Sequence, residues 1–340
     1  MKYRPRFLKM SNTLCLLLMV ILSLSFFSCK GSSKEDTQKV DKISVRLKWV
    51  FTSHTAAGPG VALEKGFFKE EGIEAKLNPG GFEFDPVTLV ASGSDDFGIK
   101  GADDVIIARS KGVPIAAIAM DYQTNPVCFM SLKDSSITEP KDFVGKKIGV
   151  KYGQNVYTFY KAMLRKLEID ENAITEVPVK FDVTPLLTNQ VDVYPGYATY
   201  EPAIFKERGI DINIILAKDY NVPAYGNVVF TSEKLIKENP GLVERFLRAY
   251  IKGWQWAVEH PDDAADIMSK LNPKFSRSLQ LEMMKLTIPY IKPKEDFKIG
   301  WMTLKGWEET QGVMLEEKII EKSINLENAF TMDFLKMIYK

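Results

Sequence analysis

The feature that most constrains this chain is a rhythm of short strand-like runs and helical segments, which occurs twice. The first round opens with ISVRLKWV at residues 43–50 and closes with the apolar run IAAIAM at 115–120. The second opens with CFMSLK at 128–133 and closes with INIIL at 212–216. Strands that alternate with helices predict an α/β fold of mixed, mostly parallel sheets with helices on their faces.

Two short polar segments that contain proline separate the rounds. Residues 122–126 read YQTNP, and residues 219–225 read DYNVPAY before the strand-like VVFTS. We therefore expect lobe 1 to comprise residues 42–123 and 225–340, and lobe 2 to comprise residues 124–224. In open α/β sheets, ligands bind at the carboxyl ends of the strands, so a cleft between the lobes is the expected site.

The last third of the chain is helical by pattern. Asn239 can cap a helix that has Pro240 at its first position. Apolar residues then recur at helical spacing from 242 to 258, which indicates a face packed on the core.

The first residues have the three parts of a secretory signal. Lys2, Arg4, Arg6 and Lys9 precede an apolar run at 14–27, which is too short to span a bilayer comfortably. Ser28 and Cys29 follow, and a cysteine after a small residue marks a lipoprotein signal. We predict a signal peptide at 1–28, lipidation of Cys29, and a polar tether at 29–41 that holds an exported protein on the cell membrane. An uncleaved anchor is the alternative.

Composition excludes several classes of function. The net charge is +1, without the basic excess that nucleic acid binding requires. Cys15 leaves with the predicted signal and Cys29 is predicted to be lipidated, so Cys128 is the remaining free thiol. Without a CxxC or a His/Cys cluster, we expect no metal site and no disulfide within the mature chain, and no cofactor motif is recognised.

Several blocks of the sequence resemble a known family. They are LEKGFFKEEGIEA at 63–75, LVASGSDDFGI at 89–99, ARSKGVPIAAIAM at 108–120, DSSITEPKDFVGKKIGV at 134–150 and VPAYGNVVFTSE at 222–233. Their order and spacing are similar to those of the SsuA/THI5-like (NMT1/THI5) solute-binding proteins of ABC transporters. The resemblance implies a two-lobed periplasmic-binding-protein type II fold that closes around a small ligand, and an ABC permease with its ATPase as partners.

Within that family, the chain looks most similar to proteins that bind pyrimidine precursors of thiamine. That subgroup has a tryptophan followed closely by a histidine, here Trp49 and His54, although the intervening VFTS departs from the usual pattern. It also has an acidic residue after a Gly-Tyr strand end, here Glu201. The return segment of the subgroup appears here at 220–225.

Candidate ligand-binding residues lie at strand ends and in polar loops. We expect Trp49 to end the first strand and stack on a flat ligand, and His54 to hydrogen-bond from a loop before the first helix. The loop at Gly153, Gln154 and Asn155 opens a helix, so its N–H groups can hold an oxygen atom. Packing in the core or on the surface is the alternative for each.

A second group of candidates comes from lobe 2 and the return segment. These residues are Tyr157, Tyr197, Tyr200, Glu201 and Tyr225. The carboxylate of Glu201 can accept a hydrogen bond from an exocyclic amine of an aminopyrimidine, whereas it would repel a sulfonate. Its alternative role is a solvated acid at a helix start.

The sequence therefore predicts a solute-binding lipoprotein, expected to be a monomer and not an enzyme, that captures a thiamine pyrimidine precursor or a similar small heteroaromatic ligand. A sulfonate or taurine binder, a sensor lipoprotein and a pyrimidine-synthase-like enzyme remain alternatives. The known synthase of this superfamily carries a Cys-rich motif that this chain lacks.

Overall fold

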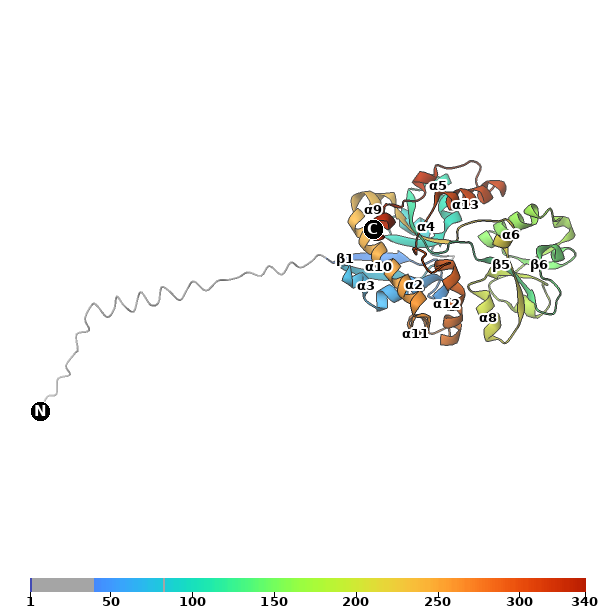
Figure 1. Cartoon of the computed structure of the whole chain (residues 1–340), viewed down its shortest axis with the longest axis horizontal. Coiled ribbons are helices and arrows are strands. Elements are labelled where there is room, and N and C mark those ends of the chain that lie inside the picture. The colour runs from blue at the N-terminus through green and yellow to red at the C-terminus, as the bar shows by residue number, and fades with distance from the viewer. Residues whose placement is uncertain (2–39, 82) are drawn as a thin grey trace. The chain divides into compact units, whose positions relative to one another are not determined.

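Strand pairing places the two rounds of alternation in separate sheets. The computed structural model describes Met1 and residues 40–81 and 83–340. A five-stranded sheet has the order β2-β1-β3-β10-β4, and we call the part built on it lobe 1. The three-stranded sheet β8-β5-β9 and the two-stranded sheet β6-β7 form the part called lobe 2, which carries α6 and α8 in Figure 1. The strands are β1 (Asp41–Arg46), β2 (Ile73–Asn78), β3 (Phe97–Gly101), β4 (Ile115–Met120), β5 (Val127–Leu132), β6 (Lys147–Val150), β7 (Thr175–Pro178), β8 (Tyr194–Tyr197), β9 (Ile212–Leu216) and β10 (Asn227–Ser232).

In each of the two larger sheets, one strand makes all of the antiparallel pairs. β1 runs parallel to β2 and β3, whereas β10 is antiparallel to β3 and β4. β5 is likewise antiparallel to β8 and β9. The α/β class and the mixed sheets are confirmed, but the expectation of mostly parallel pairing is wrong. β5 is the first strand after one crossover and β10 is the first strand after the other. Each of them runs antiparallel to both of its neighbours.

The two connections between the lobes lie side by side. Segment 121–126 joins β4 to β5, and segment 221–226 leads back into β10. The backbone N–H of Asn125 donates to the carbonyl of Ala224 at 2.9 Å, and that of Gly226 donates to the carbonyl of Tyr122 at 3.0 Å. Paired connections of this kind form a natural hinge.

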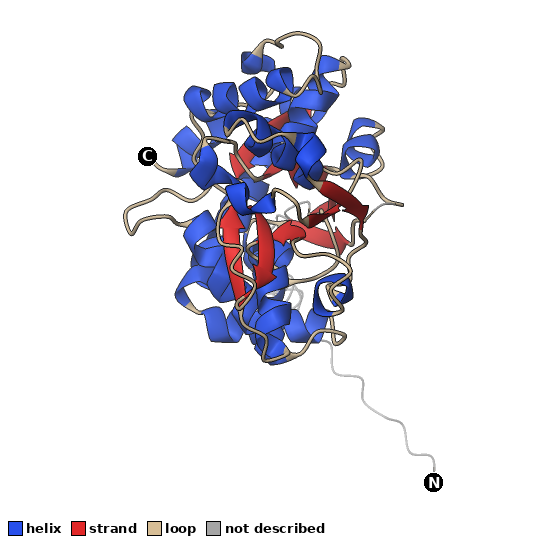
Figure 2. Ribbon diagram, turned by 90° about the vertical axis from the view of Figure 1, so that its right-hand side faces the viewer, coloured by secondary structure: helices blue, strands red, loops and turns tan. Residues whose placement is uncertain are grey.

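Helices cover the sheets in both lobes (Figure 2). In lobe 1, α10 packs on α2, as do α11 and α12, while α13 lies on α5. The Asn239 side chain accepts from the Leu242 N–H at 3.2 Å, which confirms the predicted start of α10. The helices are α2 (Ser53–Glu64), α3 (Phe67–Glu70), α4 (Pro86–Ala91), α5 (Ala102–Ser110), α6 (Asn155–Lys166), α7 (Thr184–Leu187), α8 (Glu201–Glu207), α9 (Glu233–Glu238), α10 (Pro240–Glu259), α11 (Pro261–Leu271), α12 (Arg277–Ile291), α13 (Leu304–Glu316) and α14 (Asp333–Ile338), with 3₁₀ turns η1 (Pro140–Phe143), η2 (Glu171–Ala173), η3 (Ala217–Tyr220) and η4 (Leu326–Asn328).

Helix α2 begins at Ser53, so the expectation that His54 sits in a loop is wrong. Every residue of α2 from Ser53 to Ala62 is buried, including Gly58 and Pro59, which are poor helix formers. A Cβ on Gly58 would lie 2.4 Å from the ring of Trp254 in α10. Close packing of two helices through small residues therefore outweighs the weak local preference for helix.

Strand β1 ends earlier than expected, and Trp49 follows it rather than ending it. The strand stops at Arg46, and the chain that follows it runs against the end of β2 and the loop after it. The Gly80 N–H donates to the Trp49 carbonyl at 3.0 Å, and a Cβ on Gly80 would lie only 1.9 Å from the Leu47 carbonyl oxygen. This close approach of two backbones fixes the position of Trp49.

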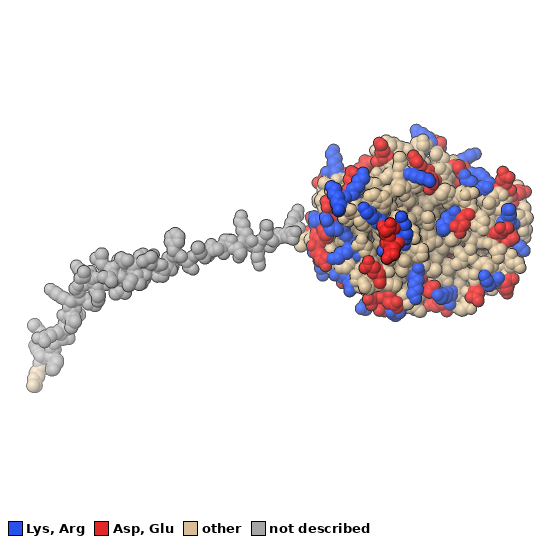
Figure 3. Space-filling view, viewed as in Figure 1, with Lys and Arg blue, Asp and Glu red and all other residues tan. Residues whose placement is uncertain are grey.

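The predicted signal segment, Cys29 and most of the tether lie outside the described residues. Within the described part, no helix has the length and apolar character needed to cross a bilayer, and no group of three side chains is suited to hold a metal ion. Acidic and basic side chains are intermixed over the face seen in Figure 3.

Candidate functional site

A cleft with a cavity volume of about 290 Å³ is lined by residues of both lobes. Eight of the ten predicted ligand-binding residues line it: Trp49, His54, Gly153, Gln154, Asn155, Tyr197, Tyr200 and Glu201. The others that line it are Lys48, Thr55, Gly81, Asp85, Lys100, Asp104, Tyr122, Pro126, Phe181, Thr199 and Asn227. The sequence therefore predicted much of one cleft, but not its charged end.

Two aromatic rings, one from each lobe, face each other in the cleft. The ring of Trp49, between β1 and α2, lies 5.3 Å from that of Phe181, between β7 and α7, at an interplanar angle of 34°. Phe181 is 37% exposed. A flat ring bound beside this pair would gain stacking contacts of about 0.5–1.5 kcal/mol beyond those of burial.

His54 is held on the first turn of α2 with a neutral ring. Its backbone carbonyl accepts a hydrogen bond from the Tyr122 hydroxyl, and its ring lies 4.7 Å from that of Tyr200. Burial, and secondarily the positive charge of Lys48, lowers the pKa of His54 to about 3. Its buried Nδ1 has no hydrogen-bond partner in the described part of the chain. Because an unpaired buried polar atom costs about 1–3 kcal/mol, Nδ1 is a natural contact for a ligand.

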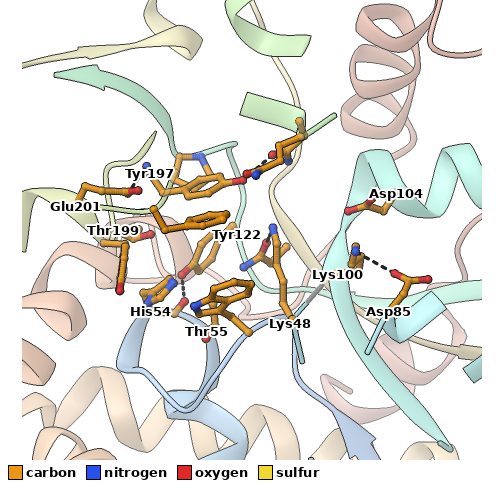
Figure 4. A pocket seen from close by; sticks show the side chains of 18 of the residues that line it. Lys48, His54, Thr55, Asp85, Lys100, Asp104, Tyr122, Tyr197, Thr199 and Glu201 are labelled. Carbon is orange, nitrogen blue, oxygen red and sulfur yellow. Dashed lines mark hydrogen bonds and ion pairs between the residues drawn. The ribbon is translucent and has the colours of Figure 1, made fainter. Parts of the chain in front are cut away.

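The opposite end of the cleft carries charges of both signs. Lys48 donates to the Asn227 side chain at 2.7 Å, and Lys100 pairs with Asp85 at 3.0 Å. Figure 4 shows Lys100, Asp85 and Asp104 on one side of the site, and His54, Thr199 and Glu201 on the other. Burial lowers the pKa of Lys48, although the negative charges of Asp104 and Asp103 oppose this effect. The charges largely balance within this end.

Behind this end lies a buried acid that does not line the cleft. Burial, reinforced by the charge of Asp104, raises the pKa of Asp103 to about 6. The side chain of Asp103 is 2% exposed. An acid of this kind is partly protonated near neutral pH, which reduces the negative charge beside Lys48.

Glu201 lines the cleft as half of a buried ion pair. Its Oε1 lies 3.2 Å from Lys151 Nζ, and both side chains are 1% exposed. Its Oε2 accepts the Tyr197 backbone N–H at 2.7 Å. A Cβ on Gly196 would lie 2.4–2.7 Å from the carboxyl atoms, so glycine leaves room for them. The alternative of a solvated acid at a helix start is therefore wrong, and the negative charge is balanced by the protein itself.

The loop before α6 lines the cleft with Gly153, Gln154 and Asn155. Gly153 has a φ of +74°, which favours glycine. The Gln154 N–H already donates to the Lys151 carbonyl at 3.2 Å. The Asn155 side chain accepts from the Tyr197 hydroxyl at 2.6 Å, so this loop is fixed to the end of β8.

Tyr157 and Tyr225 lie outside the lining of the cleft. The Tyr157 hydroxyl donates to Glu176 in lobe 2 at 3.2 Å. The Tyr225 hydroxyl lies 3.0 Å from the Thr303 hydroxyl and accepts the Thr303 N–H at 2.9 Å. Both side chains are engaged in packing within the protein.

The charged end could have been anticipated from strand ends. Lys48 follows β1 and Lys100 lies near the end of β3, and these two strands are parallel neighbours. The carboxyl ends of parallel strands meet at one edge of a sheet, so this topology places the two lysines close to each other. Phe181 had no such signal, because its loop carries no periodic pattern.

Comparisons with known proteins agree with this architecture. A formylaminopyrimidine-binding protein of Halalkalibacterium halodurans is 27% identical over 328 residues, which cover 93% of this chain and 96% of that protein. The riboflavin-binding protein RibY of Chloroflexus aurantiacus is 27% identical over 81% of each chain. A 4-amino-5-hydroxymethyl-2-methylpyrimidine phosphate synthase of Legionella pneumophila is 22% identical over 86% of this chain and 92% of that protein.

Among solved structures, the periplasmic aliphatic sulphonate binding protein SsuA of Escherichia coli superposes with a TM-score of 0.69 at 13% identity. The match covers 86% of this chain and 92% of that one. It supports the two-lobed periplasmic-binding-protein fold expected from the sequence. The profile of the family described as NMT1/THI5 like matches residues 54–264, which is more than half of the chain. The chain therefore belongs to the NMT1/THI5-like family.

Proposed function

We propose that this protein is the solute-binding lipoprotein of an ABC importer and captures a small heteroaromatic ligand, such as a pyrimidine precursor of thiamine, by closure of its lobes. The observation that carries the proposal is the contact between the rings of Trp49 and Phe181, which line the same cleft as the neutral His54 with its unpaired Nδ1. Rings and a few directed polar groups are what a site for a flat, polar ring requires.

The size of the cleft favours one small ring over a larger cofactor. Ligand pockets usually measure about 300–1,000 Å³, and this cavity, at about 290 Å³, falls at the small end. A substituted pyrimidine suits it better than a three-ring flavin of the kind named for the Chloroflexus relative. The name of the Halalkalibacterium relative points in the same direction.

A sulfonate is the second candidate, and Lys48 and Lys100 are the observation that favours it. Both cations line the cleft. Lys100, however, is already paired with Asp85, and Asp104 lines the same end. A sulfonate placed there would meet two carboxylates, which makes this ligand the weaker candidate.

Catalysis by a cysteine nucleophile has little support from this chain. Cys128 is fully buried in β5, and burial raises the pKa of its thiol well above the ordinary value. A protonated, inaccessible thiol is a poor nucleophile. We therefore place the protein with the binding members of the family, and propose that Cys29 anchors a monomer to the membrane next to its permease and ATPase.

Isothermal calorimetry with a panel of ligands tests the proposal. The panel comprises a hydroxymethyl- and a formylamino-pyrimidine, riboflavin, taurine and an alkanesulfonate. We expect the pyrimidines to bind and Trp49→Ala to weaken them about tenfold, in line with the loss of one stacked ring. Trp256→Ala, which alters a ring outside the cleft lining, serves as the matched control. Tight binding of taurine with no response to either pyrimidine would refute the proposed ligand class.

A further inference from the structure

Lys151 lies behind the wall of the cleft and does not line it. It follows β6 and is 3% exposed. Its Nζ lies 3.2 Å from Glu201 Oε1, 5.0 Å from the centre of the Phe181 ring and 4.7 Å from that of Tyr194. One buried ammonium group therefore contacts Glu201 and Phe181, two of the residues that lobe 2 contributes to the cleft lining.

These contacts fix the positions of two residues that line the cleft, Glu201 and Phe181. The cation holds the Glu201 carboxylate from one side, while the Tyr197 N–H holds it from the other. The same cation attracts the face of the Phe181 ring, which carries the negative end of the ring quadrupole. Phe181 in turn faces Trp49 of lobe 1. Displacement of Lys151 would thus disturb both halves of the site.

The Lys151–Glu201 ion pair also sets the charge of the lobe 2 wall, by which we mean the part of the cleft lining that lobe 2 contributes. The negative charge of Glu201 contributes to raising the pKa of four further groups: Cys128, Tyr194, Tyr197 and Tyr200. Burial is the main cause that raises the pKa of each of them, to about 12 for Tyr200, so all four are neutral. Lys151 is then the cation that balances Glu201 among these groups.

We propose that Lys151 is a positioning residue that makes this wall a fixed, electrically neutral acceptor, so that the cleft selects a neutral ring with an amino or hydroxyl donor over a cationic one. The inference rests on the proposed function, because it concerns the same ligand. Lys151 acts through Glu201 and Phe181 and does not itself touch the ligand.

A double-mutant cycle tests this role. The proteins to be compared are the unmodified protein, Lys151→Met, Glu201→Gln and the double variant. Lys151→Arg is added as the conservative replacement. The probe is 4-amino-5-hydroxymethyl-2-methylpyrimidine, measured by calorimetry at a series of pH values. We expect each single change to weaken binding about tenfold or more, and the double variant to be no weaker than the poorer single variant, because the two residues act as one unit. Lys151→Arg should restore most of the affinity.

The pH profile separates positioning from a general loss of structure. Burial disfavours a carboxylate that has lost its cation, so we expect Lys151→Met to bind the probe better as pH rises. The double variant has no carboxylate there and should lack this additional pH dependence. Because all variants meet the same probe, titration of the probe itself cancels in the comparison.

Three outcomes are distinguishable. Lys151→Met breaks a buried ion pair, which is costly to folding, but the double variant removes both charges and keeps the cycle measurable against Lys151→Arg. Additive losses, or a Lys151→Met profile parallel to that of the double variant, would overturn the positioning role while leaving the proposed function intact. Failure of the unmodified protein to bind the probe would overturn the proposed function, and this inference with it.

Discussion

The neutral state of His54 makes a quantitative prediction about acid stability. Burial, with a smaller contribution from Lys48, lowers the pKa of His54 from 6.5 to about 3 in the folded protein. The folded state therefore binds fewer protons at this residue than the unfolded state does. The resulting stability is complete above the unfolded pKa of 6.5 and is lost progressively as pH falls toward 3.

The size of the effect follows from the same two values. Each pKa unit corresponds to about 1.4 kcal/mol, so the full difference is about 5 kcal/mol. At about pH 5, the unfolded chain is almost fully protonated at His54, and about 2 kcal/mol has been lost relative to about pH 8. A domain with a usual stability of about 5–15 kcal/mol would show this clearly.

Urea unfolding across this pH range is the assay, with His54→Asn compared against the unmodified protein. Other buried acids also titrate, so the difference between the two curves, rather than either curve alone, reports His54. In a His260→Asn background, the remaining imidazole NMR signal belongs to His54, because the chain has two histidines. Parallel stability curves, or an imidazole that titrates near pH 6.5 (about the ordinary value for histidine), would refute the reasoning.

Two further predictions concern other buried groups. Burial raises the pKa of Asp121 to about 7, so the folded state binds more protons there and loses stability as pH rises from about 4. Asp121→Asn, which keeps an acceptor for the Tyr250 hydroxyl 2.8 Å away, should stabilise the protein by up to about 4 kcal/mol at about pH 8 and little at about pH 4. Equal effects in thermal unfolding at both pH values would contradict this. Gly196→Ala should displace the Glu201 carboxylate, cost about 1–3 kcal/mol of stability and weaken ligand binding in calorimetry. Gly241→Ala, where a Cβ meets no neighbour, is the control, and equal affinity of the two variants would argue against a fixed Glu201.

Local patterns in the sequence determined the elements of this protein and their order. The start of α10 at Pro240, capped by Asn239, was readable because capping chemistry is local to four residues. The crossovers were readable because polar, proline-containing segments interrupt the two rounds of alternation. Since ligands gather at strand ends, these patterns also located the cleft and eight of the nineteen residues that line it.

The tertiary structure alone decided the electrical and steric state of those residues. Glu201 gave no sign in the sequence that Lys151, fifty residues away, would neutralise it, because the two meet only when β6 and β8 are brought together. His54 entered a helix rather than a loop because Trp254 packs against the small residues of α2. Burial and pairing depend on contacts between distant segments, and local sequence does not encode them.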